Sequence, residues 1–299
     1  MLCVVVLNYS DYKTTIEFVN SVINYEIIDH IVIVDNCSPD SSYEKLATIY
    51  KNHEDVVDVI RTKRNGGYGY GNNYGVNYCI EKYGAQHILI SNPDVEVEEI
   101  TIKKCLDYLM QYKECAVVSP VMLNHDMTLN KRCVWKKPTY WEYLFFSLTL
   151  MGRFFQGMYY SIDSFDKDNQ AVKVGCVAGS LLMVDAQKMV TAGMYDENIF
   201  LYCEETVLGI KMHNAGFYSA LLLKERFVHH HSVSINKSIK SKMRQVVLMW
   251  KSRLYVLNNY YPNNLLIGMF NYLIAGIALC ETFLLGQIKK NTKKNKGRK

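Results

Sequence analysis

The sequence contains no CxxC pair and no internal repeat, and its first residues carry no secretory signal pattern. Its nine cysteines lie mostly within apolar runs, which suits reduced core thiols better than a disulfide framework or a zinc site. Residues 1–7 lead directly into an apolar run, without a basic stretch or a small-residue cleavage site. These absences predict a cytosolic protein with reduced thiols.

Charge is scarce along most of the chain and concentrated at its end. Of the 299 residues, 49% are hydrophobic and 21% charged, which is enough to bury a core in one large domain or two small ones. The net charge is +5, and residues 289–299 hold seven Lys and Arg side chains and no acid. Because this basic excess lies in a tail beside an apolar segment, nucleic-acid binding has little support.

Strand and helix patterns alternate along the first half of the chain. The apolar runs at residues 4–7 and 31–34 lack polar alternation, as expected for strands that are covered on both faces. Residues 13–24, between them, have the spacing of an amphipathic helix. Further strands are expected at 56–60, 86–90 and 116–119, and further helices at 74–83, 100–112 and 204–215. This alternation predicts a doubly wound α/β domain with a mostly parallel sheet.

Two predicted strands end in acidic residues. Asp94 closes a Ser-Asn-Pro-Asp turn after residues 86–90, and Asp35 follows residues 31–34. Ligands of open α/β sheets bind outside the carboxyl ends of the strands, so Asp94 is a candidate to hold a ligand or metal. Asp35 could accept hydrogen bonds from a nucleobase or a ribose hydroxyl. The alternatives are that Asp94 only shapes a turn and that Asp35 caps a helix.

A glycine-rich segment, residues 65–75, follows the third predicted strand and opens a helix. Its glycines allow close backbone approach, and its amides could face a phosphate. It is not a dinucleotide fingerprint, which belongs after the first strand with an acid about 20 residues further on. Nucleotidyl transfer to a sugar phosphate is a second hypothesis, but it would need a glycine-rich basic loop after the first strand, where residues 8–11 read Asn-Tyr-Ser-Asp.

The middle of the chain is less regular. Residues 128–168 are aromatic and poorly periodic, and they could form a lid, an acceptor platform, a lipid-facing surface or a plain hydrophobic cluster. Residues 174–184 return to an apolar pattern with small residues, where the backbone at Gly179 and Ser180 could approach a ligand closely.

Six segments in order resemble the family 2 inverting glycosyltransferases, and within them the bacterial rhamnosyltransferase-like branch that builds surface polysaccharides. They lie within about the first 235 residues, at 4–9, 33–38, 65–75, 91–94, 193–197 and 200–205. The resemblance implies a GT-A fold, a nucleotide-diphosphate sugar donor and a divalent cation, Mg²⁺ or Mn²⁺. We therefore expect a GT-A catalytic domain over residues 1–235.

The resemblance also implies roles for particular residues. Asp35 would contact the base, and the donor-binding group would comprise Asn8, Asp35, Asn65, Gly66, Asn92 and Asp94. Asp94 is the surviving carboxylate of the family's acidic metal-binding triplet, in which Asn92 would add only a neutral contact. Oxygen ligands suit Mg²⁺ or Mn²⁺, which would bridge the two phosphates. His229 would be a further metal ligand, although three adjacent histidines also suit an exposed turn.

The family's general base lies in a Glu-Asp pair, which here reads Glu204-Glu205. Glu205 would take the proton of the acceptor hydroxyl, while Glu204, Gly179 and Ser180 would lie on the acceptor side. The alternative for two acids at a helix start is interaction with the helix dipole. The chain departs from the branch at Val207, which is usually acidic, and at Lys211, which keeps the charge of the usual residue without a bidentate fork.

The apolar run at residues 265–288 would form a helix about 36 Å long, enough to cross a bilayer. Glu281 inside the run, and basic residues on both sides of it, favour a helix that lies on the membrane or a re-entrant pair over a single span. We expect residues 236–299 to form a helical, membrane-associated region whose basic tail meets anionic lipid. The alternative is a helix packed on the catalytic domain or on a second copy in a homodimer.

The sequence thus predicts an inverting glycosyltransferase, peripheral to the cytoplasmic face of the membrane. It would move a sugar from dTDP-rhamnose or a UDP-hexose to a hydroxyl of a lipid-linked oligosaccharide. The alternative is a catalytically weakened nucleotide-sugar-binding partner of another membrane transferase, motivated by Asn92, Glu205 and Val207.

Overall fold

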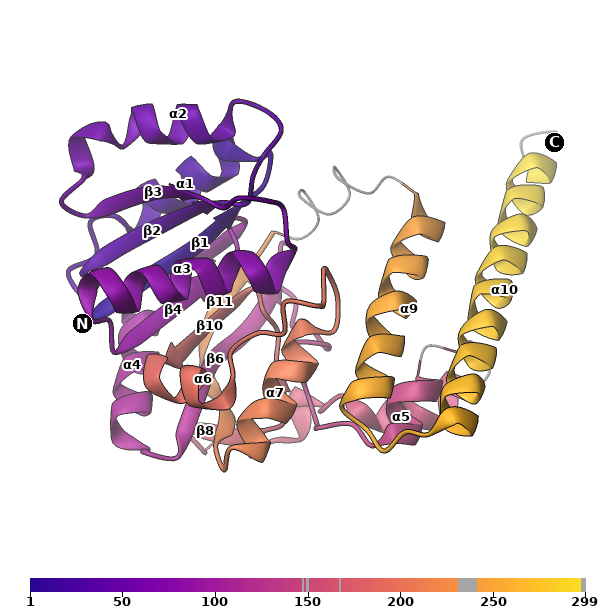
Figure 1. Cartoon of the computed structure of the whole chain (residues 1–299). Helices are drawn as coiled ribbons and strands as arrows, with labels where there is room; N and C mark the ends of the chain where they lie inside the picture. The colour runs from indigo at the N-terminus through magenta and orange to yellow at the C-terminus, as the bar shows by residue number, and fades with distance from the viewer. Residues whose placement is uncertain (147, 149–150, 167, 231–240, 297–299) are drawn as a thin grey trace.

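A single mixed β-sheet forms the centre of the molecule in the computed structural model, which describes residues 1–146, 148, 151–166, 168–230 and 241–296 (Figure 1). The strands run in the order β3-β2-β1-β4-β10-β6-β11-β5, and β8 pairs with β11. Four parallel neighbours make one half, namely β1 (Leu2–Asn8), β2 (His30–Asp35), β3 (Val57–Arg61) and β4 (His87–Ser91). This half confirms the predicted α/β domain.

The other half of the sheet contains antiparallel pairs. β10 runs antiparallel to both β4 and β6, β11 runs parallel to β6, and β5 and β8 run antiparallel to β11. Its strands are β5 (Val95–Val97), β6 (Cys115–Asn124), β8 (Ala171–Val174), β10 (Leu181–Asp185) and β11 (Tyr218–His229). A separate small sheet pairs β7 (Val134–Trp135) with β9 (Cys176–Val177).

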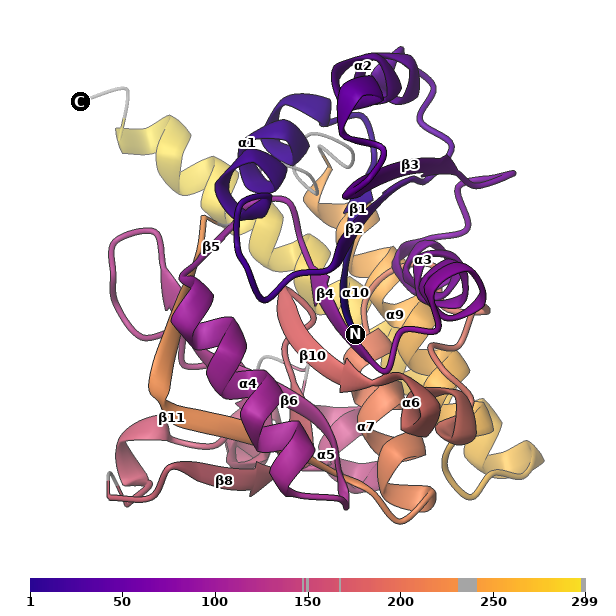
Figure 2. The same ribbon diagram turned by 90° about the vertical axis from the view of Figure 1, so that its left-hand side faces the viewer.

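Helices cover both faces of the sheet. α1 (Tyr12–Val22) and α4 (Glu99–Gln111) lie on one side, and α3 (Tyr68–Tyr83), α6 (Ala186–Ala192) and α7 (Glu204–Asn214) on the other (Figure 2). α2 (Ser42–Ile49) packs near β3, and three short 3-10 helices complete this part, η1 (Lys51–His53), η2 (Met151–Met158) and η3 (Ile162–Ser164). Because both faces are covered, the central strands carry apolar side chains at nearly every position.

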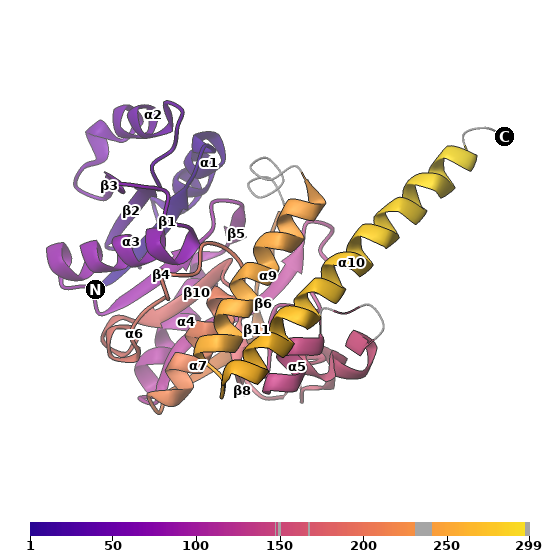
Figure 3. The same cartoon turned by 45° about the vertical axis from the view of Figure 1, so that its right-hand side comes forward.

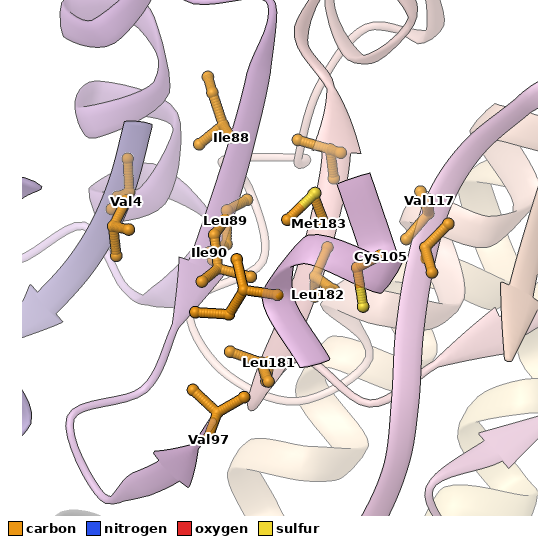
Figure 4. Close-up of a cluster of buried hydrophobic side chains, with 14 of the residues drawn as sticks. Val4, Ile88, Leu89, Ile90, Val97, Cys105, Val117, Leu181, Leu182 and Met183 are labelled. Atoms are coloured by element: carbon orange, nitrogen blue, oxygen red, sulfur yellow. The ribbon is translucent and has the colours of Figure 1, made fainter. Parts of the chain in front are cut away.

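The main core lies on both faces of the sheet, where side chains of α1, α3, α4 and α7 pack against the strands. Side chains of β4 at Ile88, Leu89 and Ile90 are almost fully buried, and they lie near those of β10 at residues 181–183 (Figure 4). Cys105 of α4 packs into the same cluster as a reduced thiol. The predicted role of the cysteines as core thiols is confirmed here, since most of the free cysteines are buried.

α3 begins earlier than its glycines suggest. The sequence placed the helix at residues 74–83, but the structure continues it back to Tyr68. A Cβ atom at Gly75 would lie 2.6 Å from Val5 Cγ1 and 2.7 Å from Val34 Cγ2, and one at Gly71 would lie 2.3 Å from Leu7 Cδ1. These glycines therefore let the helix lie directly on β1 and β2, and only residues 65–67 form a loop before it.

Two long helices follow the sheet domain, α9 (Lys242–Asn259) and α10 (Leu265–Lys296), and they lie side by side (Figures 1 and 3). They share a second hydrophobic cluster with α5 (Tyr140–Phe145) and with Val207 of α7, in which Trp250, Leu257 and Ile274 are buried. The expected domain boundary at residues 235 and 236 falls outside the described residues. The C-terminal helices are thus packed onto the body of the protein.

Residues Leu265–Gln287 form the one helix of the described chain with the length and composition needed to cross a membrane. The mean hydropathy of its most apolar window is 1.6, and 22% of that window is buried.

Candidate active site

The predicted strand ends meet at one edge of the sheet. β1, β2 and β4 are parallel, so Asn8, Asp35 and Ser91 lie at the same edge. β10 is antiparallel to β4 and begins at this edge, where Leu181 is paired with Ser91. The backbone N–H of Asn92 donates to Ser180 O at 2.8 Å, which joins the turn before Asp94 to the segment before β10. The candidate donor-side and acceptor-side residues are therefore neighbours.

Asp35 is enclosed by donors from its own surroundings. Asn8 Nδ2 and Ser38 Oγ donate to Asp35 Oδ1 at 2.8 and 2.6 Å, and Ser38 N donates to Oδ2 at 3.0 Å. Arg61 Nε lies 3.4 Å from Oδ2, and both Asp35 and Asn8 are fully buried. A direct contact between Asp35 and a nucleobase would require one of these donors to move. In the structure, Asn8 and Asp35 shape the loop after β2.

The loop before α3 is held by amide side chains. Asn65 Oδ1 accepts from Asn36 Nδ2 and from Gly67 N, both at 3.1 Å. Gly67 has a φ of +94°, and a Cβ there would lie 2.0 Å from the carbonyl oxygen of Phe200. That oxygen accepts from Tyr68 N at 3.0 Å. A residue without a side chain is needed at Gly67, because the chain bends back here against the segment that precedes α7.

Glu205 lies at the start of α7 and reaches the acceptor-side backbone. Gly179 N donates to Glu205 Oε1 at 3.2 Å, and the hydroxyl of Tyr68 donates to Gly179 O. The ring of Tyr68 packs edge-on against Tyr195, with the ring centroids 5.7 Å apart. The starts of α3, β10 and α7 thus meet around one carboxylate. Tyr68 was missed from the sequence, where its only signal was a large aromatic side chain among glycines.

The environment of the two glutamates favours their protonated forms. Burial raises the pKa of Glu205, and backbone hydrogen bonds offset part of this effect. Burial, followed by the charge of Glu205, raises the pKa of Glu204 well above its ordinary value. Glu204 is 3% exposed, and its Oε1 has no hydrogen-bond partner among the described residues. A carboxylate with a raised pKa is a stronger proton acceptor, as a general base must be.

Asp94, in the turn before β5, lies beside His229 at the end of β11. His229 Nε2 is 3.1 Å from Asp94 Oδ1, and both side chains are largely buried. In an octahedral site with bonds of 2.0–2.1 Å, two adjacent ligand atoms are separated by about 3 Å. The separation of these two atoms matches adjacent positions around a divalent cation, and it is equally the length of a hydrogen bond between them. No group of three or more His, Cys, Asp or Glu side chains that could hold a metal occurs in the part of the chain described, so the protein would supply few ligands.

The structure gives a reason for each of the two departures from the branch, Val207 and Lys211, which both lie on α7. Val207 is fully buried in the cluster shared with the C-terminal helices, where an acid would be costly. Lys211 Nζ donates to the carbonyl oxygens of Gly193 and Met194 at 2.8 and 3.0 Å. These contacts hold the end of α6 against α7 and need no bidentate fork.

The mixed sheet, with helices on both faces and polar residues gathered at the strand ends, defines a GT-A fold. Several solved structures share this fold. GalNAc-T7 with UDP, GalNAc and Mn²⁺ has a TM-score of 0.58 and 16% identity, and the match covers 78% of this chain and 44% of that one. Mannosyltransferase PcManGT from Pyrobaculum calidifontis, in complex with GDP-Man and Mn²⁺, has a TM-score of 0.56 and 11% identity, and the match covers 93% of this chain and 69% of that one. S. aureus TarS 1–349 is a third, with a TM-score of 0.54 and 13% identity over 93% of this chain and 70% of that one.

Within this fold class, the chain belongs to glycosyl transferase family 2, whose model matches residues 3–169. A curated relative is the low-salt glycan biosynthesis hexosyltransferase Agl10 of Haloferax volcanii, which is 25% identical over 205 residues. The alignment covers 68% of this chain, which spans 59% of that relative's length. The family and fold that the sequence indicated are confirmed, whereas the rhamnosyltransferase-like branch and a bacterial pathway stay predictions.

Proposed function

We propose that this protein transfers a hexose from a nucleotide-diphosphate donor to a hydroxyl of a lipid-linked saccharide, with inversion at the anomeric carbon. The observation that carries the proposal is the position of Glu205, whose Oε1 accepts from Gly179 N at the edge of the sheet where β4 ends. The relative that is a hexosyltransferase supports a hexose. dTDP-rhamnose and UDP-hexoses are the donors that we would test first.

Glu205 acts as the general base in this proposal. The acceptor oxygen attacks the anomeric carbon on the face opposite the diphosphate, so that one carbon–oxygen bond forms while the bond to the phosphate oxygen breaks. The hydroxyl proton passes to the Glu205 carboxylate. The raised pKa of Glu205 strengthens it as an acceptor of this proton. Glu204, Gly179 and Ser180 would border the acceptor.

Asp94 and His229 would hold the divalent cation, with the donor diphosphate completing its coordination. When bound, the cation supplies positive charge that stabilises the departing nucleotide diphosphate. One carboxylate oxygen and one imidazole nitrogen suit Mn²⁺ better than Mg²⁺, which prefers oxygen ligands throughout. Mn²⁺ is also the ion present in two of the neighbouring structures.

The donor would lie along the loops after β1, β2 and β3. Asn65, Gly66 and Asn92 would border this region, while the hydrogen bond between Asn8 and Asp35 would keep the loop after β2 in shape. Asp35 would contact the nucleobase only if one of the groups that now donate hydrogen bonds to it moved away. A thermal-shift screen of nucleotide sugars, with and without Mn²⁺, would identify the donor, because a ligand that binds only the folded state raises the melting temperature.

The outward face of α10 supports a membrane-bound acceptor. Its large apolar side chains are exposed, including Leu265 at 80%, Leu273 at 60% and Leu284 at 60%, while its inner face at Ala275 and Ala278 is small. Asn271 at this inner face donates to Asn258 Oδ1 of α9 at 3.0 Å. Small residues and polar contacts between helices, with large apolar residues outside, are typical of helices that face lipid. We propose a protein peripheral to the cytoplasmic face of the membrane.

Two variants test the proposed chemistry. We expect Glu205→Gln to lower kcat at least about a hundredfold while donor binding is kept, because only the proton acceptor is lost. We expect Asp94→Ala to lose the Mn²⁺-dependent part of donor binding, measured by calorimetry. Glu98→Gln, which changes an exposed acid at the start of α4, is the matched control.

Transfer that survives both changes would contradict these roles. Tight donor binding by the unchanged protein, without turnover on any lipid-linked acceptor, would instead favour a nucleotide-sugar-binding partner of another transferase.

A further inference from the structure

The end of α9 holds the chain segment that leads into α7. Tyr260 and Tyr255 donate their hydroxyls to Asp196 Oδ2 at 2.6 and 3.0 Å. Ser252 Oγ, one turn earlier on the same helix, donates to Leu201 O at 2.7 Å. Asp196 is 9% exposed, so these bonds lie in a largely buried place. Two side chains of α9 and that of Tyr260, the residue that follows the helix, thus hold the segment at two points five residues apart.

This segment determines where Glu205 lies. Phe200 O accepts from Tyr68 N, which ties the segment to the start of α3. Tyr202 and Cys203 then adopt φ angles of 70° and 77°, and α7 begins at the next residue. Such left-handed conformations cost about 1–3 kcal/mol each for residues other than glycine, and they persist only when the surroundings enforce them. The contacts of α9 with Asp196 and Leu201 lie directly before this strained turn.

The hydrogen bonds that Asp196 accepts favour its ionised carboxylate form. Burial acts to raise its pKa, but hydrogen bonds from Tyr260, Asn198 and Tyr255 outweigh burial and lower the pKa of Asp196. Asn198 N and Nδ2 donate to Oδ1 at 3.0 and 2.9 Å, so the two tyrosines serve the other oxygen. Without the tyrosine hydroxyls, a buried charged oxygen would lose both of these donors, and the segment would have to shift to find others.

We propose that Ser252 and Tyr255 of α9, with Tyr260 directly after it, are positioning residues that hold Glu205 in place through residues 196–203. The proposal rests on the proposed function, because Glu205 is the base there. It makes α9 a part of the catalytic apparatus as well as the support of α10. The C-terminal helices are then linked to Glu205 through the hydroxyl groups of Tyr255 and Tyr260. Substitution of these tyrosines by phenylalanine removes the hydrogen bonds and keeps the aromatic rings.

The test compares Tyr255→Phe/Tyr260→Phe with Tyr261→Phe. Tyr261 is the matched control, because it directly follows Tyr260 in the chain and its hydroxyl donates to Pro138 O at 2.7 Å, a backbone oxygen outside residues 196–203. We expect the double variant to lower kcat about tenfold with the donor KM unchanged, since a small misplacement of a catalytic group is costly. We expect Ser252→Ala to act in the same direction.

Two further measurements separate positioning from a general loss of stability. Amide hydrogen exchange over residues 196–205 should be faster in the double variant than in Tyr261→Phe. The acid limb of the pH profile of kcat should move to lower pH, because a loosened segment admits water and reduces the effect of burial on the pKa of Glu205.

Equal exchange and equal kcat in the double variant and in Tyr261→Phe would overturn the proposal. So would a fall in kcat that only follows a fall in melting temperature, with an unmoved pH profile. The exchange experiment needs no substrate. If the unchanged protein transfers no sugar, the proposed function fails, while exchange rates still show whether α9 holds the segment.

Discussion

At the scale of single residues, Glu204 is the most unusual side chain of the site. It is buried beside a second acid, and its Oε1 lacks a partner within the described chain. Because burial raises its pKa in the folded state, folding favours the protonated form. This contribution to stability is fully present below the pKa of the unfolded chain and is lost as the pH rises through the folded pKa. The ionised acid therefore costs stability at neutral and alkaline pH.

We expect Glu204→Gln to raise the melting temperature by a few degrees at pH 8 and to change it little at pH 5, because glutamine removes the charge and keeps the shape. Thermal unfolding at the two pH values measures the difference. Glu98→Gln is the control and should show no pH-dependent gain, since Glu98 is exposed. An equal shift of Glu204→Gln at both pH values would show that its ionisation is not involved.

At the scale of the elements, α3 shows how packing overrides local propensity. Glycine inside a helix costs up to about 1 kcal/mol relative to alanine, so the glycine-rich run reads as a loop. The structure makes it two turns of helix, because Gly71 and Gly75 let the helix axis approach β1 and β2. The glycines serve close contact between a helix and the sheet, and the loop that was predicted to face a phosphate shrinks to residues 65–67.

We expect Gly75→Ala to destabilise the protein by about 1–3 kcal/mol, because the added methyl group would overlap Val5 and Val34. Gly276→Ala is the matched control, as this glycine of α10 has no atom within 4 Å of an added Cβ. The control should be neutral or stabilise by up to about 1 kcal/mol. Urea unfolding with unchanged m-values measures both, and equal midpoints would contradict the packing argument.

The strands that could be predicted from the sequence are those with a local signal. β1, β2, β4 and part of β6 hold unbroken apolar runs, so their burial shows in composition alone, whereas β3 is interrupted by Asp58 and is mostly half-buried. β5 has three residues, and β7 and β9 have two each, too short for any pattern. The order of motifs also pointed to Glu205, Asp94 and His229. The contacts of Tyr68 with Gly179 and of Tyr255 with Asp196 join distant segments, so no local pattern could reveal them.

At the scale of the whole molecule, the C-terminal helices pack against the protein body and also present an exposed apolar surface. α9 and α10 share a buried cluster with α5 and α7, and α10 runs beside α9 (Figure 3). Large apolar side chains of α10, among them Leu273 and Leu284, are exposed. Trp141 of α5, 54% exposed, lies beside Phe270 and adds to this surface near the start of α10. An apolar surface of this extent is rare on a protein that stays in water.

We expect the protein to float with vesicles that contain anionic lipid and to bind neutral vesicles more weakly, because the basic tail of residues 289–299 adds attraction to negative charge. Leu273→Asp/Leu284→Asp should lower the vesicle-bound fraction at least about tenfold, since each exposed leucine is worth about 1.5–3 kcal/mol when buried. Ile49→Asp, which changes an exposed apolar residue at the end of α2, is the control and should float as before.

The same variants decide between lipid and a second copy of the chain as the cover of α10. If sedimentation shows that the unchanged protein is a dimer in solution and that Leu273→Asp/Leu284→Asp makes it a monomer, the surface is a subunit interface. Full solubility of the unchanged monomer at low salt, with no flotation, would contradict the membrane proposal. Flotation of a monomer that requires both leucines would support it, because only burial of this face in lipid explains that dependence.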